Sequence, residues 1–406
     1  MLKNFILTCS IFIFTLSLIV HPVNGLDFEK MSVNQKIGQM ICLDFRFWNS
    51  EDLKQTEDIG ILSKDEDLIQ KPVTEINDEI REIIAKYNIG SVILFSQNFK
   101  DKSQTKKLIF DLQETAKLSG NPPLFICVDQ EGGKVERFAF NRERLEDNLE
   151  LGRRANAEEL AFKKGEFIGK ELNELGINCN LAPVVDINSN PKNPIINSRS
   201  FGDNSEIVSK CGIAFMKGLH SQKVFGVAKH FPGHGDTQVD SHIGLPRVNK
   251  SFLELENFEL KPFKAMIDSG IDMVMTAHIE LPNVENKTII SKKNGKEIFV
   301  PATLSKTILN GLLREKLEFK GVIVTDAMNM KAISDNVGQD EAIKMAINAG
   351  ANIICMPVIL RSKCDIKKLD CVYKAISKAI ETGEVSIAQI DDSVRKILTL
   401  KEKLTI

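Results

Sequence analysis

The chain has 406 residues, of which 43% are apolar, and its 53 Lys and Arg residues nearly balance 55 Asp and Glu residues to give a net charge of −2. This apolar fraction is sufficient for a large hydrophobic core, and the near-neutral charge gives no indication of a nucleic-acid partner. A guide of ~150 residues per domain permits two domains, but α/β barrels often exceed that length as one domain.

The first residues predict a secretory signal peptide. Lys3 precedes an uncharged apolar run of 16 residues from Phe5 to Val20, and the pattern Val23-Asn24-Gly25 predicts cleavage near Gly25. Because the run is shorter than the ~20 residues of a spanning helix, an N-terminal membrane anchor is the alternative. We therefore assign residues 1–25 to a signal peptide and expect a secreted or periplasmic protein without stable membrane insertion.

Eight short apolar runs in the remaining chain predict eight strands. They are Ile37 to Phe45, Ser91 to Phe95, Pro123 to Val128, Ile177 to Ile187, Val224 to Ala228, Met273 to Ala277, Gly321 to Thr325 and Asn352 to Met356. Amphipathic stretches separate most of them. A doubly wound sheet would carry a glycine fingerprint after its first strand, and none is present there, so the alternation predicts a single α/β barrel of the (β/α)8, or TIM, type.

Several helices and one insertion are also predicted. The clearest helix is Asn156 to Gly176, with an apolar face at Leu160, Phe167, Ile168, Leu172 and Leu175. Others are Ala302 to Leu313 with a cap near Thr303, Glu341 to Ala349, Asp365 to Glu381 and Ile387 to Lys401. The last two are expected to close the barrel without room for another domain, and Asn49 to Asn77 is a predicted surface loop or lid.

The cysteines favour core positions over a metal site. Cys42, Cys127, Cys179 and Cys355 lie in strand-like runs and are expected to be buried. Cys364 and Cys371 are close enough in sequence to pair, but spacing does not decide the question. The absence of a CxxC pattern gives no support to a zinc ribbon.

Two segments concentrate reactive side chains directly after predicted strands. KHFPGHGDTQVDSH, Lys229 to His242, holds three of the six histidines, two aspartates and a lysine, and GVIVTDAMNM delivers Asp326 after a β-branched run. Catalytic residues of barrel enzymes come from the C-terminal ends of several strands. Both segments therefore predict an active site at that end of the barrel.

Six motifs occur in an order that resembles glycoside hydrolase family 3, most closely its β-N-acetylhexosaminidase branch. They are VDQEGGKVERF (128–138), LAPVVDI (181–187), SRSFG (198–202), KHFPGHGDT with DSH, MTAHI (275–279) and VTDAM (324–328). The resemblance covers nearly the whole mature chain. It implies that residues 26–406 form a catalytic barrel of the family's N-terminal type, acting on a carbohydrate without a cofactor or metal.

The resemblance implies a retaining, double-displacement mechanism. Asp326 would attack the anomeric carbon, and His242, oriented by Asp240, would act as the general acid and base. Histidine suits this role because its unperturbed pKa lies near ~6.5. The structural alternatives are a helix-capping role for Asp326 and a solvated loop position for His242.

The resemblance also implies a set of sugar ligands. Lys229 and His230 would bind hydroxyl groups, and Asp129, Arg137 and Arg199 would hold the terminal sugar, since buried hydroxyls need partners. For the two arginines, ordinary salt bridges between strands are the alternative. The roles of His234, Asp236 and His278 stay open, and His220 is expected to be structural.

These inferences predict a monomeric exo-β-N-acetylglucosaminidase that releases terminal GlcNAc from peptidoglycan fragments or chitooligosaccharides. A family 3 β-glucosidase and a GlcNAc phosphorylase are the alternatives within this chemistry. A metal-dependent hydrolase would use His230, His234, Asp236, Asp240 and His242 as ligands, but barrel metal sites also need ligands from other strands, and strand one has no HxH. A non-catalytic glycan-binding protein is the alternative outside the enzymes.

Overall fold

The computed structural model describes residues 28–49 and 70–404, so the predicted signal peptide and most of the predicted loop from Asn49 to Asn77 lie outside the described residues. Within these ranges, eight strands form one sheet in the order β11-β8-β7-β6-β3-β2-β1-β12, and every neighbouring pair is parallel. A parallel bridge between Val324 and Ile353 joins the two ends of this order. The sheet is therefore a closed barrel, which confirms the predicted (β/α)8 fold.

Each predicted apolar run contains one strand of the barrel. The strands are β1 (Ile41–Asp44), β2 (Ser91–Leu94), β3 (Phe125–Val128), β6 (Cys179–Asn180), β7 (Phe225–Phe231), β8 (Met273–Thr276), β11 (Val322–Val324) and β12 (Ile354–Cys355). All of their residues are buried because the barrel interior covers one face and the helices cover the other. The four cysteines expected in strands are buried as predicted, whereas Cys371 is an exposed, free thiol.

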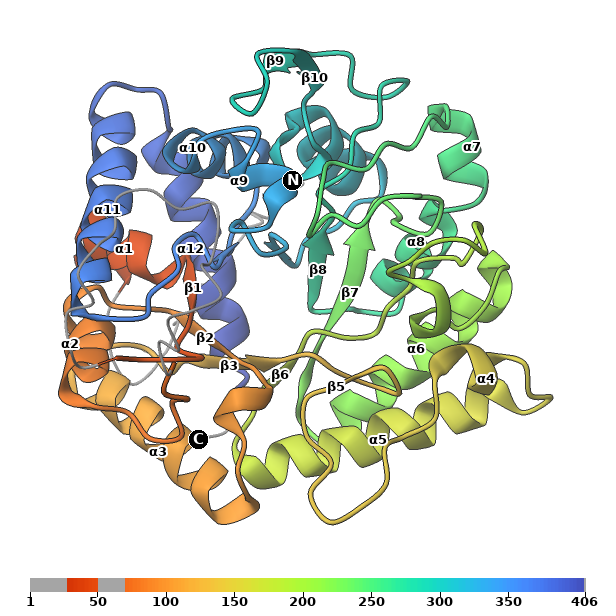
Figure 1. Cartoon of the computed structure of the whole chain (residues 1–406), viewed down its shortest axis with the longest axis horizontal. Coiled ribbons are helices and arrows are strands. Elements are labelled where there is room, and N and C mark those ends of the chain that lie inside the picture. Colours follow the sequence, from red (N-terminus) through yellow and green to blue (C-terminus); the bar gives the residue numbers. More distant parts are fainter. Residues whose placement is uncertain (1–27, 50–69, 405–406) are drawn as a thin grey trace, which may run out of the picture.

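Helices surround the barrel, as Figure 1 shows. They are α1 (Val33–Gln39), α2 (Asp78–Lys86), α3 (Lys102–Leu118), α4 (Asn148–Gly152), α5 (Ala157–Leu175), α6 (Ser205–Ser221), α7 (Phe252–Asn257), α8 (Leu260–Asp268), η5 (Thr307–Lys316), α9 (Lys331–Ser334), α10 (Gln339–Ala349), α11 (Ile366–Glu381) and α12 (Ile387–Lys401). Within the described ranges, none of the helices has the length and apolar character that crossing a membrane requires.

The helix predictions hold where the sequence carries clear end signals. α5 begins after Asn156 and ends at Gly176, which has a φ of 86°, a conformation that glycine adopts without steric cost. Its predicted apolar face is wrong at Phe167, which is 42% exposed. The ring of Phe167 instead lies against the guanidinium of Arg142.

Three predicted boundaries are wrong for local reasons. Ile37 belongs to α1 and not to the first strand, because Ser32 and Gln35 form a capping box that begins a helix there. The run from Ile177 to Ile187 leaves the ladder after Asn180, and Pro183 has no N–H to pair. The cap of η5 is Ser305, whose Oγ accepts the Ile308 N–H at 3.1 Å, whereas Thr303 is fully buried below the active site.

Two hairpins extend from the carboxyl ends of barrel strands. β4 (Gln130–Gly132) and β5 (Val135–Glu136) follow β3, and β9 (Thr288–Ile290) pairs with β10 (Glu297–Phe299) after β8. The first hairpin is buried along β4, so it brings additional side chains from the end of β3 into the interior.

Candidate active site

A cavity of about 320 Å³ is lined by all eight predicted site residues. They are Asp129, Arg137, Arg199, Lys229, His230, Asp240, His242 and Asp326. Asp129 directly follows β3, Lys229 and His230 lie in the last turns of β7, and Asp326 follows β11. Barrel topology thus gathers residues that are up to two hundred positions apart in sequence, at the end of the barrel where active sites are found.

Lys229 is 1% exposed and lies between two carboxylates. Its Nζ is 2.8 Å from Asp129 Oδ1 and 2.7 Å from Glu131 Oε1. Burial alone would raise the pKa of both carboxyl groups, but the neighbouring cations reverse this effect. Lys229 and Arg137 hold the pKa of Asp129 well below its usual range, and Arg199 and Lys229 lower the pKa of Glu131 to about 2.

Both predicted arginines form ion pairs as well as lining the cavity. Arg199 donates through Nε and Nη2 to the two oxygens of Glu131 at 2.9 and 2.8 Å, a bidentate pair that fixes the plane of the guanidinium. Arg137 donates to Asp129 Oδ2 at 2.8 Å. The salt-bridge alternative from the sequence is therefore present, and it orients both cations at the cavity wall.

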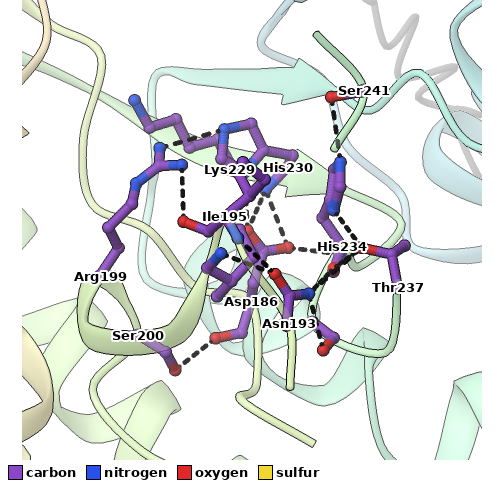
Figure 2. Close-up of polar contacts among 12 residues, drawn as sticks. Asp186, Asn193, Ile195, Arg199, Ser200, Lys229, His230, His234, Thr237 and Ser241 are labelled. Atoms are coloured by element: carbon purple, nitrogen blue, oxygen red, sulfur yellow. Dashed lines mark hydrogen bonds and ion pairs between the residues drawn. The ribbon is translucent and has the colours of Figure 1, made fainter. Parts of the chain in front are cut away.

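His230 is held by Asp186, as Figure 2 shows. Asp186 is 1% exposed and accepts the His230 Nδ1–H at 2.7 Å, the His230 backbone N–H at 3.1 Å and the His234 backbone N–H at 2.7 Å. Despite burial, which opposes ionisation, the adjacent His230 lowers the pKa of Asp186. The proton on Nδ1 leaves Nε2 of His230 toward Arg199, whose Nη2 lies 3.5 Å away.

The His242–Asp240 pair lies at the mouth of the cavity. Asp240 Oδ1 accepts both the backbone N–H of His242 and its Nδ1–H at 2.8 Å. The His242 side chain is 65% exposed, and among the described residues none is hydrogen-bonded to its Nε2. The carboxylate fixes the ring tautomer and leaves Nε2 available for proton exchange with a bound molecule.

Asp326 lies on the segment that follows β11 and accepts the Ala327 N–H at 2.7 Å. Burial opposes ionisation of this carboxyl group, but His278, His230 and the Ala327 N–H together lower the pKa of Asp326. His278 is fully buried, and its Nε2–H donates to Ala327 O at 3.0 Å while Nδ1 contacts Thr303 Oγ1 at 2.8 Å. His278 thus ties the end of β8 to the segment that carries Asp326.

Two buried carboxylates in this cluster were not predicted as site residues. Glu131 lies inside the motif VDQEGGKVERF, and Asp186 ends the motif LAPVVDI, so each was visible in a motif but had no assigned partner. Asp236, whose role was left open, pairs with Lys250 at 3.4 Å away from the buried cluster. His220 is structural as expected, since its Nε2 is 2.6 Å from Asp272 Oδ2.

The described residues contain no group of three or more His, Cys, Asp or Glu side chains arranged to hold a metal ion. The side chains proposed as ligands in the metal alternative make other contacts. His230 binds Asp186, His242 binds Asp240, and Asp236 binds Lys250.

The buried Glu131 predicts a pH-dependent contribution to stability. Its folded pKa lies below the ordinary value of 4.5, so the contribution is present above about pH 4.5 and is lost as pH falls toward about 2. Glu131→Gln should lower the unfolding free energy at pH 7 by roughly 3 to 5 kcal/mol, because Lys229 and Arg199 lose a buried partner. Between pH 7 and pH 3 this difference should shrink by roughly 2 kcal/mol.

Urea unfolding of both proteins at several pH values measures the difference. A gap between wild type and Glu131→Gln that stays constant down to pH 3 would show that Glu131 is not ionised through its buried ion pairs.

Comparison with known proteins gives consistent matches. Residues 32–400 match the model of the glycosyl hydrolase family 3 N terminal domain. "Beta-hexosaminidase A" of Pseudoalteromonas piscicida is 39% identical over 381 residues, which cover 92% of this chain and 62% of that protein. "Beta-hexosaminidase" of Tolumonas auensis is 34% identical over 282 residues, which cover 69% of this chain and 79% of that protein.

A solved structure agrees with these sequence matches. The family 3 β-N-acetylglucosaminidase of Paenibacillus sp. has a TM-score of 0.78 and 36% identity, covering 92% of this chain and 62% of the other. This chain therefore spans about 62% of the length of the Pseudoalteromonas and Paenibacillus proteins. By the family match over residues 32–400 and the relatives that share it, the chain belongs to glycosyl hydrolase family 3, as an N-terminal domain of that family.

Proposed function

We propose that the protein is a retaining exo-β-N-acetylglucosaminidase. The observation that carries the proposal is the pairing, within one cavity, of a carboxylate whose pKa is lowered and a histidine whose Nδ1–H is held by a carboxylate. Relatives named β-hexosaminidase and β-N-acetylglucosaminidase support it.

In the first step, a carboxylate oxygen of Asp326 attacks the anomeric carbon and forms a glycosyl ester as the bond to the leaving oxygen breaks. A carboxyl group with a lowered pKa is ionised at neutral pH, so it needs no base to activate it. The imidazolium of His242 gives the Nε2 proton to the leaving oxygen, and Asp240 stabilises its positive charge before transfer.

In the second step, water attacks the anomeric carbon and displaces the Asp326 carboxylate. Neutral His242 accepts the proton from this water at Nε2, which restores the imidazolium for the next cycle. Two displacements at the same carbon retain the β configuration of the sugar.

The other lining residues suit recognition of one sugar ring. Lys229, Arg199 and Arg137 present cations whose orientation is fixed by Asp129 and Glu131, and these carboxylates are also acceptors for hydroxyl groups. A volume of about 320 Å³ lies at the lower end of the range for ligand cavities and favours a single terminal unit over an internal stretch of a chain. We propose peptidoglycan fragments or chitooligosaccharides as the source of this unit.

We further propose that residues 26–406 act as an exported monomer. Export rests on the charged start and the apolar run before Gly25, and a monomer is sufficient because one chain supplies every lining residue of the cavity. N-terminal sequencing of protein from the native host should find a mature start near Leu26. Recovery of the full-length chain from the cytosol would refute the cleavage.

The acid role of His242 predicts a dependence on the leaving group. His242→Ala should lower turnover of a glycoside with an unactivated alkyl aglycone by roughly 100- to 10,000-fold, because the departing alkoxide then leaves without a proton. A nitrophenyl glycoside needs less help and should be affected much less in single-turnover glycosylation. Equal losses on both substrates would exclude His242 as the acid.

Substrate choice tests the proposed activity itself. The kcat/KM should be far higher for 4-nitrophenyl β-N-acetylglucosaminide than for the matched β-glucoside, because a site that pairs an acetamido group leaves polar atoms unsatisfied when that group is absent. Parallel reactions with a muropeptide disaccharide and with chitobiose, each with and without phosphate, identify the glycan and the acceptor. A preference for the glucoside would contradict the proposed activity.

A further inference from the structure

The loop that carries the His242–Asp240 pair is anchored unevenly. Its first half, residues 234–237, is fixed to the preceding chain by Asn193, whose Nδ2 donates to His234 O at 2.8 Å and Gly235 O at 3.0 Å. Gly235 permits this close packing, since a Cβ there would lie 1.7 Å from Ile187 O. The first half is thus firmly seated beside Asp186.

The second half, residues 238–242, is held through Ser241. Ser241 is 2% exposed although it lies between Asp240 and the exposed His242. Its Oγ is 3.3 Å from His234 Nε2, and its carbonyl oxygen accepts the Ala332 N–H at 3.2 Å. Val239 and Ile243 on either side are 44% and 68% exposed. Ser241 is therefore the point at which the catalytic pair is attached to the barrel.

The His234 ring bridges the two halves of the loop, as Figure 2 shows. Thr237 Oγ1 donates to His234 O at 3.0 Å, so at its 2.9 Å contact with His234 Nδ1 it is the acceptor and Nδ1 carries the proton. His234 Nε2 then has a free lone pair, which accepts the Ser241 hydroxyl. Burial and the neighbouring His230 lower the pKa of His234 to about 4, which agrees with a neutral ring.

We infer that His234 is a positioning residue for the acid/base pair: its neutral ring links Thr237 to Ser241 and so holds His242 and Asp240 over the cavity. The inference assigns a role to a histidine that the sequence left open, and it rests on the proposed function for the meaning of that position. His234 acts through Ser241 and not through the sugar, although its ring lines the same cavity. A latch and a direct sugar contact therefore predict different consequences of its removal.

The test is a double-mutant cycle between His234 and His242. His234→Asn keeps a group near Thr237 but is too short to reach Ser241, so turnover of an unactivated alkyl β-N-acetylglucosaminide should fall about 10- to 100-fold, with KM little changed. In the His242→Ala background the same substitution should cost less than about twofold, because the residue that His234 positions is already absent. A full loss in that background would show direct action on the sugar and overturn the inference.

Two further variants complete the design. Ser241→Ala removes the partner of the latch without changing His234 and should show the same leaving-group dependence to a smaller extent. Asp236→Asn is the matched control, since Asp236 belongs to the same loop but pairs with Lys250, and its rates should stay close to wild type. A control that loses as much activity as Ser241→Ala would show that any change in this loop is harmful and would overturn a specific latch.

A measurement without substrate separates this inference from the proposed activity. Amide hydrogen exchange of the peptide 236–244 should accelerate in His234→Asn and Ser241→Ala and stay unchanged in Asp236→Asn. If wild type shows no glycosidase activity but the exchange pattern appears, the proposed function fails and the latch stands. Unchanged exchange in both latch variants refutes the latch whatever the activity.

Discussion

The buried ammonium of Lys229 is the constraint on which the site depends. A lysine with 1% exposure needs paired negative charge, since an uncompensated buried charge costs several kcal/mol. Asp129 and Glu131, from the end of β3 and the hairpin that follows it, supply that charge. These two carboxylates then fix Arg137 and Arg199, so one buried cation organises the wall of the cavity.

The network extends from this cation through alternating charges. Arg199 contacts His230, His230 is held by Asp186, and Asp186 also accepts the backbone N–H of His234. Apart from the histidines, three cations (Lys229, Arg137, Arg199) face three carboxylates (Asp129, Glu131, Asp186). Because these charges balance, Asp326 stands outside the ion pairs with its lowered pKa and remains available to a bound sugar.

The fold and the grouping of site residues followed from sequence for a physical reason. Strands of a parallel barrel are buried on both faces, so they appear as apolar runs, and the residues that follow such runs must meet at one end of the barrel. Strand lengths did not follow, because they depend on where pairing ends. The run containing Cys179 was predicted over eleven residues, whereas only Cys179 and Asn180 pair as a strand.

The buried partners could not be predicted in the same way. Glu131 and Asp186 are acceptable inside the protein only because cations or imidazoles reach them from segments far away in the chain. A carboxylate beside an apolar run reads equally well as exposed. Thr303 shows the converse, since it resembled a helix cap but is a buried contact of His278, and only the packing of η4 (Ala302–Leu304) against β8 distinguishes the two.

The most direct test of the account is to trap the glycosyl ester on its nucleophile. Incubation with a fluorinated N-acetylglucosaminide that reacts quickly and hydrolyses slowly, followed by intact-mass and peptide analysis, should find one sugar attached to the peptide containing Asp326. Asp326→Asn should remain unlabelled while retaining its fold by circular dichroism. A label on another residue, or an active wild type that never accumulates label, would contradict the assignment of Asp326 as the nucleophile.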